Sequence, residues 1–479
     1  MTPPARSGLR KRLLRTLYVT HRWLGIGIGL LMTSWCLSGM VMLWRPWPIP
    51  DPAAGQGVHG PLHLPAQLPP IAALTEPEER FQSFRLGMTG EAPVLTLVPV
   101  AGAPFAVDLR TGQRGGIAPE DAGASAQAYA AAVGVQERRA FEGTTTDDQW
   151  VLDTPGRMGG FERFRFPGPR HLVVYVSPLT GDVTQATDTT SRAWAWVGAI
   201  PHWLYPAALR RHPPAWKWTV IILSGTGMFL TVTGLVVGLL RLRKRWPFSH
   251  YHRWHLVHHL GGLVFGLLAL SWIATGFLTM NPGGAFESRK ETLAPLHVTG
   301  SMTGREVFAV LDRVLRASPA DWTDVRSVLL NGRIFLAVTA RDRHRQRLDA
   351  SLSPAPLAKE ALGQSALLLT EPDQYYFDRP LRKRPFPVFR LSTTDGTLFY
   401  LDACSGEVLA AFDRPARQSR WMVYGLHDMD VLSWLRTPTA RLMIVFPCLC
   451  GVCLIFLSGI VIGVKYLRAE PPRNRSGRM

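Results

Sequence analysis

The sequence predicts an α-helical membrane protein with four transmembrane helices, an internal twofold repeat and two external α+β domains. Four apolar runs of membrane length are separated by long polar segments, and basic residues collect at one set of run ends. The segment 191–243 also recurs without a gap at 416–468. Four identical residue pairs in these segments have a constant spacing of 225 positions: Trp196 and Trp421, His202 and His427, Gly234 and Gly459, Gly238 and Gly463.

The apolar runs define the membrane part. Each has about twenty residues, the length that crosses a hydrocarbon core of about 30 Å. They cover approximately 23–44, 216–240, 256–280 and 442–464. The first run exceeds the ~7–15 residues of a signal-peptide core and ends among tryptophans rather than small residues, so we expect it to be retained as a helix.

These runs divide the chain into six predicted parts. The predicted boundaries are 1–44 for the N-terminus and first transmembrane helix, 45–190 for the first external domain, 191–241 for an interfacial segment and the second helix, 242–281 for a loop and the third helix, 282–415 for the second external domain, and 416–479 for an interfacial segment, the fourth helix and a tail.

The net charge of +18 comes largely from helix ends. Basic residues precede the first helix, occupy the loop between the second and third, and follow the fourth. Because such residues mark the cytoplasmic side, we expect both termini and the middle loop to be cytoplasmic. This placement argues against nucleic acid as a partner.

The five cysteines predict no disulfide in the external domains, because only Cys404 lies there. Cys448, Cys450 and Cys453 lie together in the fourth helix, but the repeat places leucine, glycine and methionine at the matching positions. We therefore interpret them as small packing residues rather than metal ligands.

The first and third helices also match each other, with a constant spacing of 237 positions. The matched pairs are His21 and His258, Gly25 and Gly262, Gly29 and Gly266, Trp35 and Trp272, Gly39 and Gly276. Every transmembrane helix thereby carries a GxxxG. Such a groove admits either a neighbouring backbone or a flat ligand, and the pattern alone does not choose between them.

The two external segments share one order of predicted elements, a helix followed by strands and a tight turn. A Pro-rich linker, a helix near 124–133 and a strand–turn–strand unit turning at Thr180-Gly181 are expected in the first. The second has a helix over 305–316 and a turn at Asn331-Gly332. The spacing of 225 continues here, relating Asp148 to Asp373 and Tyr175 to Tyr400.

The repeated histidines are the candidate cofactor ligands. Histidine at membrane depth is costly unless paired or ligated. Haem ligation by two histidines needs imidazoles that face each other from different helices, and a twofold axis supplies them. We expect His21 with His258 at one site and His202 with His427 at a second, with His255 and His259 as alternatives to His258. The matched tryptophans Trp35 and Trp272 have two interpretations: they assist electron transfer, or they anchor the helices at the membrane interface.

Several stretches resemble the PepSY-associated transmembrane family of iron-regulated membrane proteins. They are HRWLG, GAIPHWLY, YVSPLTGDV, YLDACSGEV and DQYYFDRP followed by RPFPVFR. Some members of that family resemble haem-containing ferric-siderophore reductases. The resemblance implies PepSY-like external domains that are periplasmic, a bacterial inner-membrane location, and two b haems that pass electrons to a ferric siderophore or related metal complex. One departure is Val423-Tyr424-Gly425, where the family often has an aromatic–histidine pair.

Other parts of the mechanism stay open. No dinucleotide-binding GxGxxG, P-loop, GxSxG or HExxH is present, so electrons would come from a quinol or a separate cytoplasmic reductase. No catalytic residue is assigned. The basic, aromatic stretch 373–390 could meet an anionic chelate or serve as a solvated loop. Two rival functions are a non-redox iron or copper transport component and a membrane-anchored binding or regulatory module.

Overall fold

The structure is a computed structural model that describes residues 5–152, 160–288, 300–317, 320–363, 365–379 and 383–468. The chain divides into two compact units, each built from segments that are distant in sequence. The helical unit contains Met1–Trp47, Trp194–Glu287 and Pro415–Met479, and the sheet unit contains Pro48–Ala193 and Ser288–Arg414. The described residues do not include the predicted cytoplasmic tail after Arg468. They also leave out Arg382 of the basic stretch 373–390.

Within the described part of the chain, four helices are long and apolar enough to cross a membrane, which confirms the predicted number of spans. They contain 27 to 32 residues, more than the about 20 that a bilayer needs. The spans are Lys11–Met42 within α1 (Ala5–Met42), Pro213–Arg241 (α8), Arg253–Thr279 (α9) and Pro438–Arg468. The last comprises α12 (Pro438–Ala440), η6 (Arg441–Val445) and α13 (Phe446–Arg468).

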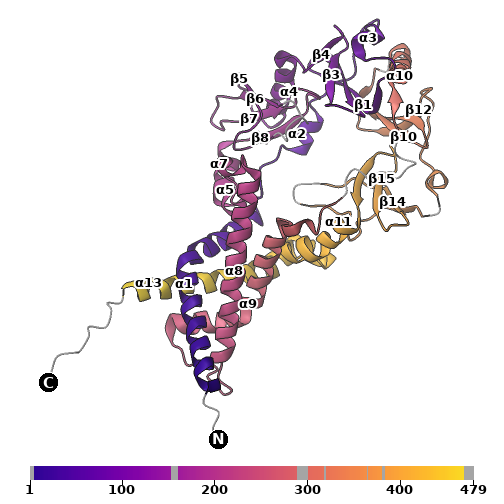
Figure 1. The fold of residues 1–479 in the computed structure, drawn as a ribbon. Coiled ribbons are helices and arrows are strands. Elements are labelled where there is room, and N and C mark those ends of the chain that lie inside the picture. The colour runs from indigo at the N-terminus through magenta and orange to yellow at the C-terminus, as the bar shows by residue number, and fades with distance from the viewer. Residues whose placement is uncertain are drawn as a thin grey trace, which may run out of the picture. The chain divides into compact units, whose positions relative to one another are not determined.

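The long helices pack as a ring. α1 contacts α8 and α13, and α9 contacts the same two helices (Figure 1). α1 and α9 are therefore opposite each other, and each carries one histidine of the first predicted pair. Glycines at the crossings allow close packing: a Cβ on Gly266 would come within 2.6 Å of Leu235, and one on Gly451 within 2.5 Å of Phe265.

Short helices flank the long ones along the chain, and one of them, α6, carries His202. They are α5 (Thr189–Val197), α6 (Ala199–Trp203), α7 (Ala207–Arg210), η1 (Pro282–Gly284), α11 (Arg414–Ser419), η4 (Arg420–Gly425) and η5 (Ser433–Arg436). α6 packs against α1, and the π-helical turn η4 packs against α9. Leu204 ends α6 in a left-handed conformation, which turns the chain after His202.

The sheet unit is organised around a large antiparallel sheet in the order β12-β11-β10-β1-β2-β3-β4, with β9 paired to β1. Its strands are β1 (Arg80–Thr89), β2 (Ala92–Pro99), β3 (Phe105–Asp108), β4 (Gln113–Gly115), β9 (Met302–Thr303), β10 (Trp322–Leu330), β11 (Arg333–Ala340) and β12 (Arg345–Asp349). The central pairing, β1 with β10, joins strands from the two segments that we predict to be external.

Two four-stranded antiparallel sheets complete this unit, one from each external segment. The first contains β5 (Ala140–Thr145), β6 (Phe161–Arg165), β7 (Val173–Val176) and β8 (Val183–Thr187), and the second contains β13 (Leu367–Leu369), β14 (Val388–Ser392), β15 (Leu398–Asp402) and β16 (Val408–Phe412). The helices of the unit are α2 (Pro52–Gln56), α3 (Ile71–Leu74), α4 (Pro119–Ala132), α10 (Gly304–Ala317) and η3 (Lys359–Leu362). α4 covers strands β6 to β8.

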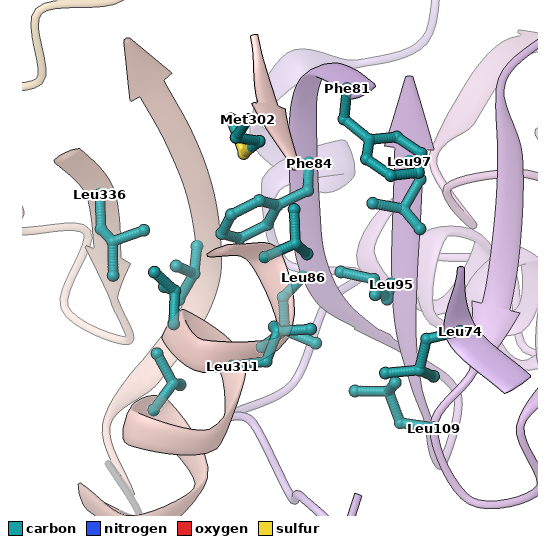
Figure 2. Close-up of a cluster of buried hydrophobic side chains, with 14 of the residues drawn as sticks. Leu74, Phe81, Phe84, Leu86, Leu95, Leu97, Leu109, Met302, Leu311 and Leu336 are labelled. Atoms are coloured by element: carbon teal, nitrogen blue, oxygen red, sulfur yellow. The ribbon is translucent and has the colours of Figure 1, made fainter. Parts of the chain in front are cut away.

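The largest hydrophobic core lies under the shared sheet and draws on both external segments (Figure 2). Phe84 and Leu86 of β1 meet Leu311 of α10 and Leu336 of β11 there, all fully or almost fully buried. The sequence did not predict this shared core. The predicted domain boundaries 45–190 and 282–415 remain predictions, but the two segments form one compact unit.

The local predictions for these segments were more successful. The helix expected over 305–316 is α10 (Gly304–Ala317), whereas the helix expected at 124–133 begins five residues earlier, in α4 (Pro119–Ala132), where Pro119 occupies the first turn. Asn331 and Gly332 both have positive φ angles (51° and 71°), as a two-residue hairpin turn requires. Gly181, at the other predicted turn, has a φ of 69°.

Candidate functional site

The structure brings His21 and His258 together inside the helical unit. They extend from α1 and α9, the two opposite helices, and their ring centroids are 6.2 Å apart with an interplanar angle of 43°. This is the pair that the spacing of 237 positions predicts.

Each ring of this pair is held by a neighbouring helix through its Nδ1. His21 Nδ1 lies 3.2 Å from the carbonyl of Leu230 and 3.3 Å from Thr233 Oγ1 on α8. His258 Nδ1 lies 3.1 Å from both the carbonyl of Ile455 and Ser458 Oγ on α13. A carbonyl can only accept, so Nδ1 carries a proton, and in the neutral ring Nε2 then keeps its lone pair. The residues that hold the two rings also follow the repeat: Leu230 and Ile455 are 225 positions apart, and so are Thr233 and Ser458.

His202 and His427 form the second pair, again with ring centroids 6.2 Å apart, at an interplanar angle of 54°. His202 belongs to α6, and His427 follows η4. His202 Nδ1 donates to the carbonyl of Trp35 at 3.0 Å, while His427 Nδ1 lies 3.0 Å from Thr275 Oγ1. The two pairs therefore share one ring separation, and their interplanar angles differ by 11° (43° and 54°).

The predicted tryptophans lie beside the second pair. Trp35 contributes its carbonyl to His202, and Trp272 donates its indole Nε1–H to the carbonyl of His427 at 3.0 Å. These bonds place each tryptophan against a histidine from another part of the chain. The tryptophans thus have a packing role at the site whether or not they also assist electron transfer.

Glycines clear the space around all four rings. A Cβ on Gly234 would lie 2.7 Å from His21 Cε1, and one on Gly459 would lie 3.2 Å from His258 Cε1. The matching distances for Gly39 to His202 and Gly276 to His427 are 3.0 Å and 3.7 Å. Gly262, one turn beyond His258, has nothing within 4 Å of its Cβ position. Four glycines therefore seat the rings, and Gly262 faces open space.

The spacing of the rings fits a metal ion held between two imidazoles. Two metal–nitrogen bonds of about 2 Å, added to two ring half-widths of about 1 Å, separate the centroids by about 6 Å. Among the described residues, no hydrogen-bond partner meets Nε2 of any of the four rings. Two imidazoles that are oriented through Nδ1 and have no partner at Nε2 could serve as the two ligands of a b-type haem.

The two alternative ligands behave differently. His259 uses both nitrogens, with Nδ1 2.8 Å from Ser249 Oγ and Nε2 2.9 Å from the carbonyl of Gly238. His255 is exposed and stacks on Tyr251. Neither faces His21, so this geometry favours His258.

A buried ion pair near the second site was not predicted. Arg420 Nη1 lies 2.8 Å from Asp430 Oδ1, and both side chains are less than 5% exposed. A Cβ on Gly425 would come within 2.9 Å of Arg420 Nη1. This contact explains the glycine in Val423-Tyr424-Gly425, the segment that differs from the family pattern. The matching positions in the first half are Ala195 and Tyr205, so the repeat gave no signal for this pair.

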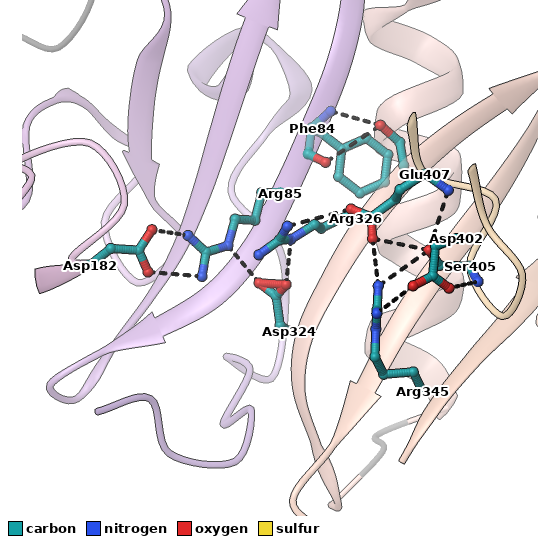
Figure 3. Close-up of polar contacts among 10 residues, drawn as sticks. Phe84, Arg85, Asp182, Asp324, Arg326, Arg345, Asp402, Ser405 and Glu407 are labelled. Atoms are coloured by element: carbon teal, nitrogen blue, oxygen red, sulfur yellow. Dashed lines mark hydrogen bonds and ion pairs between the residues drawn. The ribbon is translucent and has the colours of Figure 1, made fainter. Parts of the chain in front are cut away.

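In the sheet unit, the most extended charged network crosses the β1–β10 pairing (Figure 3). Arg85 binds both Asp182 and Asp324, and Arg326 binds Asp324 and Glu407. Burial alone would raise the pKa of Asp182, but hydrogen bonds from His59 and Arg85 hold it well below its usual range. The network fixes the junction of the two segments.

The predicted basic stretch is also engaged internally. Arg390 Nη1 bonds Asp373 at 3.0 Å, Lys383 bonds Asp378 at 2.9 Å, and the Arg384 guanidinium lies 4.7 Å from the centre of the Tyr376 ring. These contacts give the stretch a structural role. A role in meeting a chelate remains a prediction.

Fold and site together define a multi-pass membrane protein with a soluble α+β part and two histidine pairs in its helical unit. The family described as the PepSY-associated TM region matches residues 18–462, nearly the whole chain. The chain therefore belongs to the PepSY-associated transmembrane family, as the sequence motifs indicated. No curated protein matches it.

Proposed function

We propose that this protein binds two b haems, one between each histidine pair, and passes electrons across the bacterial inner membrane to a periplasmic ferric siderophore or related metal complex. Both termini would be cytoplasmic, and a quinol or a separate cytoplasmic reductase would supply the electrons. One observation carries the proposal: two histidine pairs with the same 6.2 Å ring separation.

The residues around each pair would perform three tasks. The backbone carbonyls and hydroxyls on Nδ1 fix the ring orientation and keep Nε2 unprotonated. The glycines leave room for a flat macrocycle, and the surrounding apolar side chains exclude water. Bound haem would supply one-electron redox chemistry at a potential set by its two histidine ligands and their surroundings.

An internal twofold repeat accounts for the paired sites, and the spacings of equivalent elements support it. β2 (Ala92–Pro99) and β11 (Arg333–Ala340) are displaced by 241 positions at both ends. β8 (Val183–Thr187) and β16 (Val408–Phe412) are displaced by 225. Arg85 and Arg326, also 241 apart, are direct partners across β1 and β10, as a local twofold axis between them would require.

We further propose that each half of the sheet unit is a PepSY-like domain. The ion pair between Arg85 and Asp182 has its counterpart in Arg326 and Glu407. The hydrogen bond from Tyr175 to Asp148 has its counterpart in that from Tyr400 to Asp373. This unit is the part of the chain that a water-soluble chelate could reach.

The rival functions account for less of this geometry. A transport component without redox chemistry is expected to carry carboxylates within the membrane, and the four central apolar runs contain no Asp or Glu. A membrane-anchored binding module would not need two histidine pairs held in the same way. Neither rival is favoured by a specific contact.

An absorption spectrum of the purified full-length protein, with a pyridine-haemochrome count, tests the proposal. We expect reduced α and β bands and about two haems per chain. His21→Ala and His427→Ala should each remove about one haem, because each variant deletes one ligand of one pair. His255→Ala is the matched control, since this histidine lies one turn from His258 but faces away from His21.

Two results would contradict the proposal. Protein that contains no haem after expression with ample haem would exclude the reductase mechanism and leave the rival functions. Loss of haem from the His255→Ala control, with full retention in His21→Ala, would show that the histidines are paired differently.

A further inference from the structure

A basic pocket of about 570 Å³ opens at the end of the helical unit where α1 begins and α8 ends. Its polar lining consists of Lys11, Arg15, Tyr18 and Arg22 from α1 and Arg241 from α8. None of the described residues that line it is acidic. The proposed haem sites do not use this pocket.

Two of the arginines are held in place by aromatic rings. Arg241 donates through Nε to Tyr18 Oη at 2.6 Å, and its guanidinium lies 4.8 Å from the centre of the Tyr18 ring. The Arg22 guanidinium lies 4.4 Å from the centre of the Tyr466 ring. Among the described residues, Arg22 Nε is buried without a hydrogen-bond partner. Orienting arginines before a ligand arrives lowers the entropic cost of binding an anion.

The remaining lining residues are aliphatic: Leu14, Val19 and Leu240. They lie where apolar helices capable of crossing a membrane meet their basic ends. A ligand that fits both parts has an anionic head for the guanidinium groups and an apolar body along the aliphatic side. Basic pockets of this kind between transmembrane helices bind the headgroups of anionic lipids.

The pocket belongs to one half of the molecule only. Moving Arg15 and Tyr18 forward by 237 positions gives His252 and His255, and moving Arg241 forward by 225 gives Tyr466. Two cations and their tyrosine thus have no equivalent cluster in the second half. This difference from the otherwise repeated sequence indicates a function that does not depend on the paired haem sites.

We propose that this pocket binds the phosphate of an anionic phospholipid, with the guanidinium groups on the phosphate and the aliphatic residues against the acyl chains. The inference is independent of the haem proposal, because its test measures lipid binding alone.

Native mass spectrometry of the delipidated full-length protein in detergent provides the test. Phosphatidylglycerol is titrated against phosphatidylcholine, and inorganic phosphate forms a third arm. The double variant Lys11→Gln/Arg15→Gln should weaken phosphatidylglycerol binding about thirtyfold, because two pocket cations that contribute about 1 kcal/mol each amount to about 2 kcal/mol. Both side chains are exposed, so the fold should tolerate the changes.

Two further variants make the test specific. Lys244→Gln/Arg245→Gln removes the same charge from exposed residues beyond α8, outside the pocket, and should change binding less than twofold. Lys11→Arg/Arg15→Lys keeps the charge and should retain binding. The proposal is overturned if phosphatidylcholine binds equally well, if the control loses as much affinity as the pocket variant, or if inorganic phosphate alone competes fully, which would make it a free-phosphate site.

Discussion

Each histidine is positioned by partners that belong to another helix. His21 and His258 both use Nδ1 on a carbonyl and a hydroxyl, which come from Leu230 with Thr233 and from Ile455 with Ser458. These partners lie inside the apolar spans, where small hydroxyl residues are also common packing residues. Sequence spacing could therefore predict the histidine pairs but not the groups that orient them.

Gly234 is the glycine that approaches a histidine most closely. A Cβ there would lie 2.7 Å from His21 Cε1, so Gly234→Ala should displace the ring and remove the haem that we assign to that pair. We expect the haem content to fall by about half, with the second pair unaffected. Gly27→Ala, on the same helix as His21, is the control because its Cβ would meet nothing within 4 Å. Unchanged haem content in Gly234→Ala would mean that His21 does not ligate haem.

Asp373 is the most heavily hydrogen-bonded carboxylate of the second external segment. It accepts from the backbone N–H groups of Tyr375 and Tyr376, from Tyr400 Oη at 2.6 Å and from Arg390. Burial opposes ionisation, but these bonds outweigh it and lower the pKa of Asp373 below its usual value. Asp373→Asn should reduce the free energy of unfolding of the sheet unit by about 1–3 kcal/mol at pH 7.

The effect should depend on pH in one direction. A carboxyl group with a depressed folded-state pKa stabilises the fold above its unfolded pKa of about 3.9, and this contribution disappears as the pH falls through the folded value. Thermal unfolding midpoints of wild type and Asp373→Asn should therefore converge below about pH 4. Asp378→Asn removes an exposed ion pair and should have little effect at any pH. A difference that stays the same size from pH 7 down to the lowest pH at which both proteins fold would contradict this account.

At the scale of elements, local patterns were sufficient to predict helices, strands and tight turns. Asn331-Gly332 specifies its hairpin through backbone conformation alone, and α10 follows from apolar residues at helical spacing. The pairing of β1 with β10 depends on residues more than two hundred positions apart. Because alternation predicts strands but not their partners, the sequence indicated two external domains where the structure forms one compact unit.

The same reasoning explains what was missed at the second histidine site. The buried pair of Arg420 and Asp430 has no counterpart in the first half, so no repeat revealed it. A charged residue next to a predicted interface is ordinarily interpreted as solvated. Only the three-dimensional fold shows that these two side chains neutralise each other.

The shared sheet predicts that neither external segment is stable alone. Separating β1 from β10 would expose an unpaired strand edge and about half of the common core, including Leu86 and Leu311. We expect residues 48–193 and 288–414 each to be soluble only poorly and to unfold without a cooperative transition. A single chain that joins them by a flexible linker should show one cooperative transition by circular dichroism. Two independent cooperative transitions from the separate segments would show that each is an autonomous domain.

At the scale of the whole molecule, charge placement predicts the orientation in the membrane. Arg241, Arg243, Lys244 and Arg245 lie where α8 ends and the loop to α9 begins, and Lys465 and Arg468 lie in the last turn of α13. The positive-inside rule places these ends in the cytoplasm. With four spans, we therefore expect both termini on that side and the sheet unit outside, as the proposed reduction of an external metal complex requires.

Cys404 allows this orientation to be measured directly. It is the single cysteine of the sheet unit and is exposed, whereas the other four lie in the helical unit. A membrane-impermeant maleimide should label Cys404 in spheroplasts without permeabilisation, and Cys404→Ser should abolish that labelling. In the Cys404→Ser background, Lys244→Cys should react only after permeabilisation, because its loop would face the cytoplasm. The reverse pattern, with Lys244→Cys labelled first, would invert the topology and remove the sheet unit from any external substrate, whatever the haem content of the helices.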